Sequence, residues 1–568
     1  MKNRIVFAII LCAVCSKADA DIDVRSYSLH LAVKPTNKTI DGIATIELVA
    51  DGDKTITLDF VGMTVSQVQV NSVMADWTLG NQKLTITPIV APKSGETAVL
   101  DIQYNGSPQP YIAPWGTWGL VFEEERVFAV NVTKGARYWF PCNDRLDDKA
   151  TFSVSIEVPD GWTVAAPGEL KSNEQGTWVW NANWPIPTYL MVFYAGKYEL
   201  VEKFYDNIPL KYYLHPTSWE SARKTFDHVP TILSFLTDRY GDYPFPKVGF
   251  AEINLGGAVE VPSCIGLGSQ VLAVSEPMVE VIAHELAHTW FQGVVTIKSW
   301  EDLWLSEGMA TYHEALFQES LKGFGGLKSY TKSLGLSYKT IAGLGEGWFP
   351  LTTPEKLFGV TVYRKGALVF HALRFILGDE TFKKTLLEYL KEFDLGSAST
   401  EDFKKIAEKT SGKNLDDFFA QWVQGVGYPQ YAFAWRRTGE DTSIDLYIEQ
   451  EQPWQVFTTP IEIEFLAGEK SFRTRVDIAG KETTEKVDPG FVPETVTLDP
   501  DGWILKDVKE IEFPKPILDA GPVKPQTDGM IENNGCSGCK IAGDFSWLDT
   551  FLVMWFFVFW VIRKQIAE

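Results

Sequence analysis

The segment from Val279 to His288 constrains the fold of this 568-residue chain more than any other, because it holds two histidines four positions apart. The chain has seven histidines, and His284 and His288 are the only pair with this spacing. On a helix such residues share one face, so their imidazoles can bind one Zn²⁺ together. Glu285 is turned about 100° around the helix from His284, from where its carboxylate can reach a metal-bound water.

A catalytic zinc site needs a third protein ligand and one open coordination position. Gly293 and residues 294–299 predict the end of the histidine helix. Glu307 then follows on a second apolar helix, with eighteen residues between it and His288. We therefore predict that His284, His288 and Glu307 bind one Zn²⁺ per chain. Asp302 and Glu314 are both candidates for the carboxylate that orients an imidazole, and the sequence does not decide between them.

The stretch from His284 to Gly308, HELAHTWFQGVVTIKSWEDLWLSEG, closely resembles the zinc aminopeptidases of the aminopeptidase N and leukotriene hydrolase type. In that family the third ligand lies in a W-L-N-E-G motif, and Ser306 stands here in place of the Asn. The resemblance covers residues 21–510. Four further motifs are matched: G-x-M-E-N by Gly257–Val261, Y-x-K-G by Tyr363–Gly366, F-P-C-x-D by Phe140–Asp144, and G-Y-P by Gly427–Pro429.

The resemblance implies roles for individual residues. Tyr363 is expected to stabilise the transition state, and Glu260 to hold the protonated N-terminus of a peptide. Gly257 and Ala258 belong to the same substrate-binding loop. Glu285 is expected to act as general base and then general acid, which its place between the two histidines also indicates.

Two departures from the family pattern bear on specificity. Val261 stands where the family has Asn. Val130 and Val132 stand where the family usually has Gln-x-Glu, which supplies a second anchor for the substrate amine. The sequence therefore predicts a weaker or altered amine subsite.

The apolar pattern and the resemblance together predict a multidomain α+β fold. Apolar residues alternate with polar ones in the first part of the chain, take helical spacing from about residue 205 to 427, and alternate again beyond Pro429. The resemblance implies an N-terminal β saddle, a thermolysin-like and mostly helical catalytic domain, and a small C-terminal β-sandwich. We place these domains at residues 21–202, 203–428 and 429–512. We do not expect the large C-terminal helical-repeat domain that many family members carry.

Both ends of the chain are predicted to lie outside this fold. Residues 1–20 have the basic start, apolar run and A-x-A site of a secretory signal peptide. Residues 513–540 form a linker with Cys536 and Cys539. Residues 541–568 contain the apolar stretch 545–562 and a basic end, which predict a single transmembrane helix with the catalytic domain on the extracytoplasmic side. The tail is either a plain anchor or a sorting signal that is processed or lipidated.

The formal charge of −22 excludes nucleic acid as a partner, because an acidic surface repels phosphates. It suits cationic ligands such as free amino termini. The two cysteines of the globular part, Cys142 and Cys264, are expected to be separate buried thiols. The sequence thus favours an exported, membrane-anchored zinc aminopeptidase. The alternatives are a zinc peptidase without strict N-terminal dependence and a non-catalytic peptide-binding envelope protein.

Overall fold

The computed structural model describes residues 22–113, 116–273 and 276–514, and these form two compact units. The first unit holds the described residues up to Lys203. It also includes the short segments Pro209–Pro216 and Phe245–Ala251. The second unit holds Phe204–Ile208, Thr217–Pro244 and the described residues from Glu252 onward.

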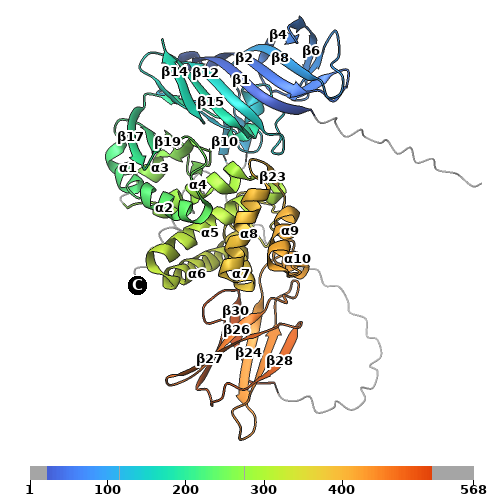
Figure 1. Cartoon of the computed structure of the whole chain (residues 1–568), viewed down its shortest axis with the longest axis vertical. Helices are drawn as coiled ribbons and strands as arrows, with labels where there is room; N and C mark the ends of the chain where they lie inside the picture. The colour runs from blue at the N-terminus through green and yellow to red at the C-terminus, as the bar shows by residue number, and fades with distance from the viewer. Residues whose placement is uncertain (1–21, 114–115, 274–275, 515–568) are drawn as a thin grey trace, which may run out of the picture. The chain divides into compact units, whose positions relative to one another are not determined.

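The first unit consists of β-sheets, as the alternating pattern predicts (Figure 1). In its largest sheet β1 pairs in parallel with β12 and antiparallel with β2, and Tyr27, Leu29 and Leu31 of β1 are buried. That eight-stranded sheet has the order β14 (Glu169–Glu174), β15 (Thr177–Ile186), β12 (Ala150–Glu157), β1 (Asp23–Lys34), β2 (Thr39–Val49), β8 (Thr97–Gly106), β4 (Thr64–Val70) and β5 (Val73–Met74).

Two smaller sheets also belong to this unit. One has the order β13 (Thr163–Ala165), β16 (Tyr194–Gly196), β11 (Arg126–Val130), β10 (Gly116–Phe122) and β9 (Tyr111–Ala113). The other has the order β3 (Ile56–Asp59), β7 (Lys83–Thr87) and β6 (Asp76–Gly80). Val130 ends strand β11, and both Val130 and Val132 are buried. Apolar packing therefore occupies the two positions where the family pattern has Gln-x-Glu.

The F-P-C-x-D motif belongs to a buried charge network in the first unit. The guanidinium of Arg137 lies 2.8 Å from carboxylate oxygens of both Asp59 and Asp144. Asp144 also accepts a hydrogen bond of 2.8 Å from the hydroxyl of Thr188. Cys142 is a buried free thiol, as is Cys264 in the second unit, which confirms the expected separate thiols. The motif thus fixes loop structure by pairing buried charges.

Several strands lie where the sequence pattern favours helix, and two of them pair in parallel. These are β18 (Ile208–Leu214) and β19 (Val248–Ile253), and they pair in parallel from Leu210 with Val248 to Tyr213 with Ala251. All six residues of β19 are buried. A strand buried on both faces shows no alternation of apolar and polar residues, so periodicity does not distinguish it from a buried helix.

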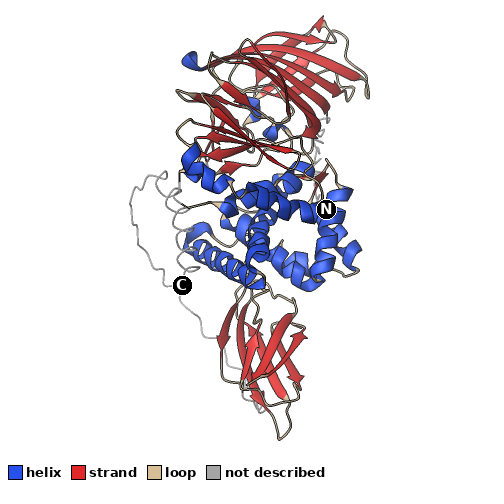
Figure 2. Cartoon of the chain, turned by 60° about the vertical axis from the view of Figure 1, so that its left-hand side comes forward, coloured by secondary structure: helices blue, strands red, loops and turns tan. Residues whose placement is uncertain are grey.

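The second unit holds the helices and a small β part, drawn in blue and red respectively in Figure 2. The helical spacing that the sequence shows from about residue 205 to 427 is observed as a series of helices between Trp219 and Trp422. The helices are α1 (Trp219–Phe226), α2 (Val229–Tyr240), α3 (Ser269–Leu272), α4 (Val279–Ala287), α5 (Leu303–Lys322), α6 (Phe324–Ile341), α7 (Gly366–Leu377), α8 (Asp379–Glu392), α9 (Thr400–Ser411) and α10 (Asp416–Trp422).

The β part of the second unit is the predicted sandwich. It packs a sheet of β28 (Glu482–Val487), β25 (Ile444–Gln450), β24 (Gln430–Arg437) and β30 (Asp507–Glu510) against one of β27 (Lys470–Val476), β26 (Ile461–Ala467) and β29 (Thr495–Leu498). Phe433 of β24 shares one apolar core with Ile463 and Phe465 of β26. Trp503, in the loop after β29, stacks on His371 of α7 with ring centroids 4.7 Å apart.

Helix α5 is the central helix of the second unit, and it packs against α4, α6 and α7. Its side chains are buried almost without a break from Leu303 to Gln318, and it ends at Gly323, whose φ of 65° favours glycine. Where α5 meets α7, Gly308 and Gly366 face each other. A Cβ on Gly366 would lie 3.0 Å from the Cα of Gly308, so the two backbones touch directly.

The ends of the chain lie outside the described residues. This applies to the predicted signal peptide, to most of the predicted linker with its Cys536 and Cys539, and to the predicted membrane span at 545–562. Among the described residues, no helix has the length and apolar character needed to cross a membrane.

The contact between α5 and α7 gives a first testable prediction. Gly366→Ala should lower the free energy of unfolding by about 1–3 kcal/mol, because the added methyl has no space between the two backbones. Gly325→Ala is the matched control, since a Cβ on this glycine of α6 would meet nothing within 4 Å. Chemical denaturation of both variants measures the difference. Equal stability of the two variants would contradict the close helix crossing.

Candidate active site

His284 of helix α4 and His288, which directly follows the helix, are both buried. All its residues from Val281 to Ala287 are buried, and the helix continues into an irregular segment, Thr289–Val294. Phe291 and Gln292 already leave helical geometry there, with φ of −100° and 157°. The histidine helix therefore ends shortly before Gly293, and the chain can return toward His288 with the start of α5.

The three predicted ligands come together from α4 and α5. Glu307 Oε2 lies 3.2 Å from His284 Nε2 and 3.4 Å from His288 Nε2. One ligand atom from each of these residues lies within 4.8 Å of the others, and all three residues are buried. Two imidazole nitrogens and one carboxylate oxygen are the ligand types of a catalytic zinc site. The donor set and its convergence therefore fit Zn²⁺.

The two imidazoles stabilise the negative charge of Glu307. Burial alone would raise the pKa of Glu307, but the neighbouring His288 and His284 outweigh it and lower that pKa to about 2. Glu307 is thus an ionised ligand at neutral pH, which a metal cation requires.

Each imidazole is held through its other nitrogen. His284 Nδ1 lies 2.8 Å from Glu314 Oε1, and the hydroxyl of Tyr330 donates to the second oxygen of the same carboxylate. A partner on Nδ1 would leave Nε2 of the ring available to bind a metal ion. Asp302, the other candidate from the sequence, instead accepts hydrogen bonds from Thr400 N at 2.7 Å and from Ser299 Oγ at 2.9 Å. Glu314 is therefore the residue that orients His284.

The second imidazole is oriented without a carboxylate. His288 Nδ1 lies 3.1 Å from Ser306 Oγ and 3.3 Å from the carbonyl oxygen of Phe291. Ser306 Oγ in turn donates to that carbonyl at 3.1 Å. The serine that replaces the family's Asn thus makes a polar contact to a ligand. Sequence reasoning did not assign Ser306 or Tyr330 a contact, although Ser306 directly precedes Glu307.

Glu285 and Tyr363 lie beside the ligands, and the surroundings raise the pKa of both side chains. Burial, together with the nearby Glu260 and Glu307, raises the pKa of Glu285 to about 7. The Tyr363 ring stacks on His284 with centroids 6.0 Å apart and planes 10° from parallel. Burial and the carboxylates of Glu307, Glu260 and Glu285 hold the Tyr363 pKa well above its usual value. Glu285 can therefore exchange a proton near neutral pH, whereas Tyr363 keeps its proton and can donate a hydrogen bond.

The loop with Gly257, Ala258 and Glu260 lies against the same group. Ala258–Val259 forms strand β20, which pairs with β21 (Ile265–Gly268), and Gly257 O accepts a hydrogen bond of 2.8 Å from Gly268 N. Glu260 follows this strand and is half-buried. Burial and the charge of Glu307 raise the Glu260 pKa, which indicates that the two carboxylates lie near each other. Val261, in place of the family's Asn, is buried.

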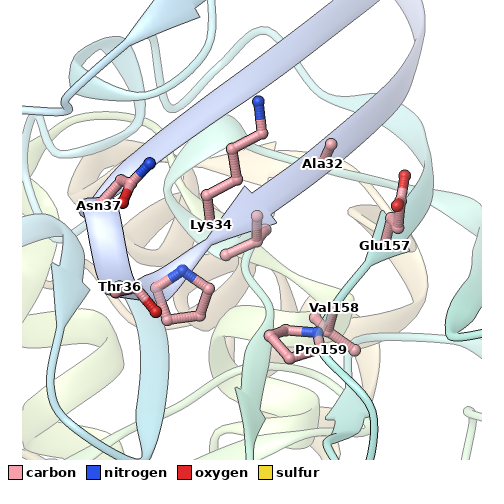
Figure 3. Close-up of a pocket in the computed structure, with 9 residues that line it drawn as sticks. Ala32, Lys34, Thr36, Asn37, Glu157, Val158 and Pro159 are labelled. Atoms are coloured by element: carbon pink, nitrogen blue, oxygen red, sulfur yellow. The ribbon is translucent and has the colours of Figure 1, made fainter.

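A separate surface hollow carries no comparable chemistry. It has a volume of about 320 Å³ and lies in the first unit, at the turn after β1 and the end of β12 (Figure 3). Its charged lining residues are Lys34, which pairs with Asp41, and Glu157. Among the described residues, the metal-binding group is found only in the second unit.

Comparisons with known families agree with this site. Residues 24–190 match the Peptidase M1 N-terminal domain, and residues 224–422 match the Peptidase family M1 domain. The chain belongs to peptidase family M1, and its His284, His288 and Glu307 form a group that could bind a zinc ion.

Individual relatives give the extent of the similarity. Aminopeptidase 2, mitochondrial, of Saccharomyces cerevisiae is 27% identical over 442 residues, which are 70% of this chain and 46% of the relative. The M1 zinc metallopeptidase of Deinococcus radiodurans is 28% identical with a TM-score of 0.64, covering 72% of this chain and 94% of that one. Legionella pneumophila aminopeptidase A, at 18% identity, shows the shared fold over 87% of this chain and 60% of its own, with a TM-score of 0.73. The chain spans about half the length of the curated relatives it matches.

The hydrogen bond between His284 and Glu314 gives a second prediction. Glu314→Ala should weaken zinc binding by about 10- to 100-fold, because the imidazole loses the partner that sets its orientation. Asp302→Asn is the control and should leave zinc affinity unchanged, since Asp302 contacts neither histidine in the described structure. Competition with a chromophoric chelator measures both affinities. The reverse ranking of the two variants would overturn the assignment of Glu314.

Proposed function

We propose that this chain is a zinc aminopeptidase that removes residues from the free N-terminus of peptides. The observation that carries the proposal is the convergence of Glu285 and Tyr363 on the ligand group His284, His288 and Glu307. The relatives support it, because they are aminopeptidases by name and a variant of the Deinococcus enzyme was crystallised with the substrate Tyr-Ser-Ala.

The side chains divide the reaction between them. A zinc ion bound by the three ligands would supply Lewis-acid chemistry, polarising the peptide carbonyl and acidifying water. Glu285, with its pKa near 7, takes the proton of the attacking water and passes it to the leaving amine. The Tyr363 hydroxyl donates a hydrogen bond to the oxygen that gains negative charge. Glu260 binds the substrate ammonium, which places the first peptide bond beside Glu285.

A second candidate function is a peptidase with the same mechanism but without strict dependence on a free N-terminus. The observation that favours it is the pair of departures from the residues with which the family binds the substrate amine. Val261 is buried, and Val130 and Val132 are buried in the first unit, so none of them offers a polar group to an ammonium. Glu260 would then be the main anionic anchor.

We also propose that the enzyme is exported and is anchored to the cell envelope by residues 541–568, with the catalytic unit on the extracytoplasmic side. The proposal is supported by the signal-peptide pattern of residues 1–20 and by the apolar stretch 545–562 with its basic end. Fractionation of cells that express the full chain tests it. Recovery of the protein in the cytoplasmic fraction would remove this part of the proposal.

The role of Glu285 gives a third prediction. Glu285→Gln should keep zinc but lower kcat by at least about 10²-fold, because the amide retains the shape of the side chain and cannot accept the proton. His288→Ala is the contrasting variant and should lose zinc together with activity. Zinc content and peptide turnover, measured on the same preparations, check both. A Gln variant with nearly normal turnover would show that another group accepts the proton.

The single carboxylate at the amine subsite gives a fourth prediction. Peptides with a free N-terminus should be cleaved about 10- to 150-fold faster than their acetylated forms, since a charge-assisted hydrogen bond contributes about 1.5–3 kcal/mol. Glu260→Ala should remove most of this preference by raising KM and lowering kcat. Paired assays on free and acetylated peptides measure it. Equal cleavage of the two by the unmutated enzyme would favour the second candidate function.

A further inference from the structure

The turn that carries Tyr363 begins at an amide held by a carboxylate from another segment. Glu346 Oε2 accepts a hydrogen bond of 2.9 Å from Val360 N. Val360 directly precedes the helical turn Thr361–Lys365, which runs on into α7. Amides at the start of a helix have no acceptor within the helix, and a carboxylate there is favoured by the helix dipole. Glu346 therefore caps the helical stretch that contains Tyr363.

The Glu346 carboxylate also packs closely against Gly359, and Gly359 is hydrogen-bonded to Tyr363. A Cβ on Gly359 would lie 2.9 Å from Glu346 Oε2, so the carboxylate packs against a position that only glycine leaves open. The amides of Val362 and Tyr363 both donate to Gly359 O, at 3.1 and 3.4 Å. Val360, which donates to Glu346, thus directly follows Gly359, which accepts from Tyr363.

The other end of the turn is held independently. Lys365 is fully buried, and its Nζ donates a hydrogen bond of 2.9 Å to Gly425 O. The turn with Tyr363 is therefore tied at its end through Lys365 and at its start through Glu346. Loss of the Glu346 contact would free the start of the turn while its end stays in place.

Glu346 itself comes from an exposed segment rather than from the core. It ends the irregular turn Ala342–Glu346, and Leu344 in this turn is 83% exposed. Gly345 and Gly347 on either side of Glu346 have φ of 141° and 89°, which L-side chains rarely adopt. The backbone is thus shaped to direct the Glu346 carboxylate at Val360, and Ala342 is the one buried residue of the turn Ala342–Glu346.

We propose that Glu346 is a positioning residue for Tyr363: its hydrogen bond to Val360 N places the tyrosine hydroxyl where the reaction develops negative charge. The effect on catalysis rests on the proposed function, whereas the role of Glu346 in holding the turn Thr361–Lys365 does not. Misplacement of a catalytic group by about 1 Å can cost about 10²-fold in rate, so a partly freed turn is expected to show a smaller loss.

Three substitutions separate the hydrogen bond from the charge. Glu346→Gln keeps an acceptor of the same reach, Glu346→Asp keeps the charge but is one methylene too short, and Glu346→Ala removes both. Glu355→Ala is the matched control, because Glu355 is exposed on the same segment and makes no hydrogen bond or ion pair with a described residue. Hydrogen exchange of the amides of residues 359–363 in the full-length protein is the first readout. It should speed up in the Ala and Asp variants and stay unchanged in the Gln variant and the control.

Kinetics on the zinc-loaded protein are the second readout. Glu346→Ala and Glu346→Asp should lower kcat by about 10-fold, with KM and zinc content unchanged, whereas Glu346→Gln should stay within about 2-fold of the unmutated protein. In a Tyr363→Phe background, Glu346→Ala should cause no further loss, because the two residues act through one hydroxyl.

Several results would overturn the proposal. These are unchanged exchange in both the Ala and Asp variants, a larger effect of Gln than of Asp, loss of zinc, or losses that add to that of Tyr363→Phe. Absence of peptide turnover in the unmutated protein would instead refute the proposed function, and the exchange experiment would still decide whether Glu346 holds the turn.

Discussion

The structure of the second unit depends on the contact of one buried carboxylate with two buried imidazoles. Glu307 meets His284 and His288 at 3.2 and 3.4 Å, so α4 and α5 must lie close and in one relative rotation. Burying these groups singly would be costly, because each would lose its hydration. Together they compensate one another, and the low pKa of Glu307 is the result. The irregular end of the histidine helix and the long buried course of α5 both serve this convergence.

Beside this group, Glu285 can accept a proton at neutral pH, whereas Tyr363 keeps its own. Glu285 lies where burial and neighbouring carboxylates bring its pKa to about 7, whereas the same surroundings keep Tyr363 protonated. The difference arises from the intrinsic acidity of the two side chains, since both experience burial and negative neighbours. A proton acceptor and a hydrogen-bond donor can therefore work side by side at neutral pH.

The ligand set could be predicted from sequence because its geometry is local: the histidines lie four positions apart on one helix, and the next apolar helix brings Glu307. The choice between Asp302 and Glu314 needed the structure. The spacing along the helix favours Glu314 in part, since Glu314 lies two turns after Glu307 and so on the same face of that helix. Strand β19 was missed because all its residues are buried, which removes the alternation that marks a strand. The contact of Ser306 with His288 depends on a turn at Phe291 and Gln292 that no pattern of apolar residues predicts.

The contact of Gly308 with Gly366 determines which parts of the site can change independently. Gly308 directly follows the ligand Glu307, and Gly366 lies three residues after Tyr363. Since backbone touches backbone there, the separation between the metal ligand and the tyrosine is set by two main chains and not by the packing of adjustable side chains. Under the proposed function, redesign of the loop with Gly257, Ala258 and Glu260 would therefore change which peptides bind without changing the distance between Glu307 and Tyr363. Protein engineering could therefore address the choice of peptide and the reaction step at different positions of the chain.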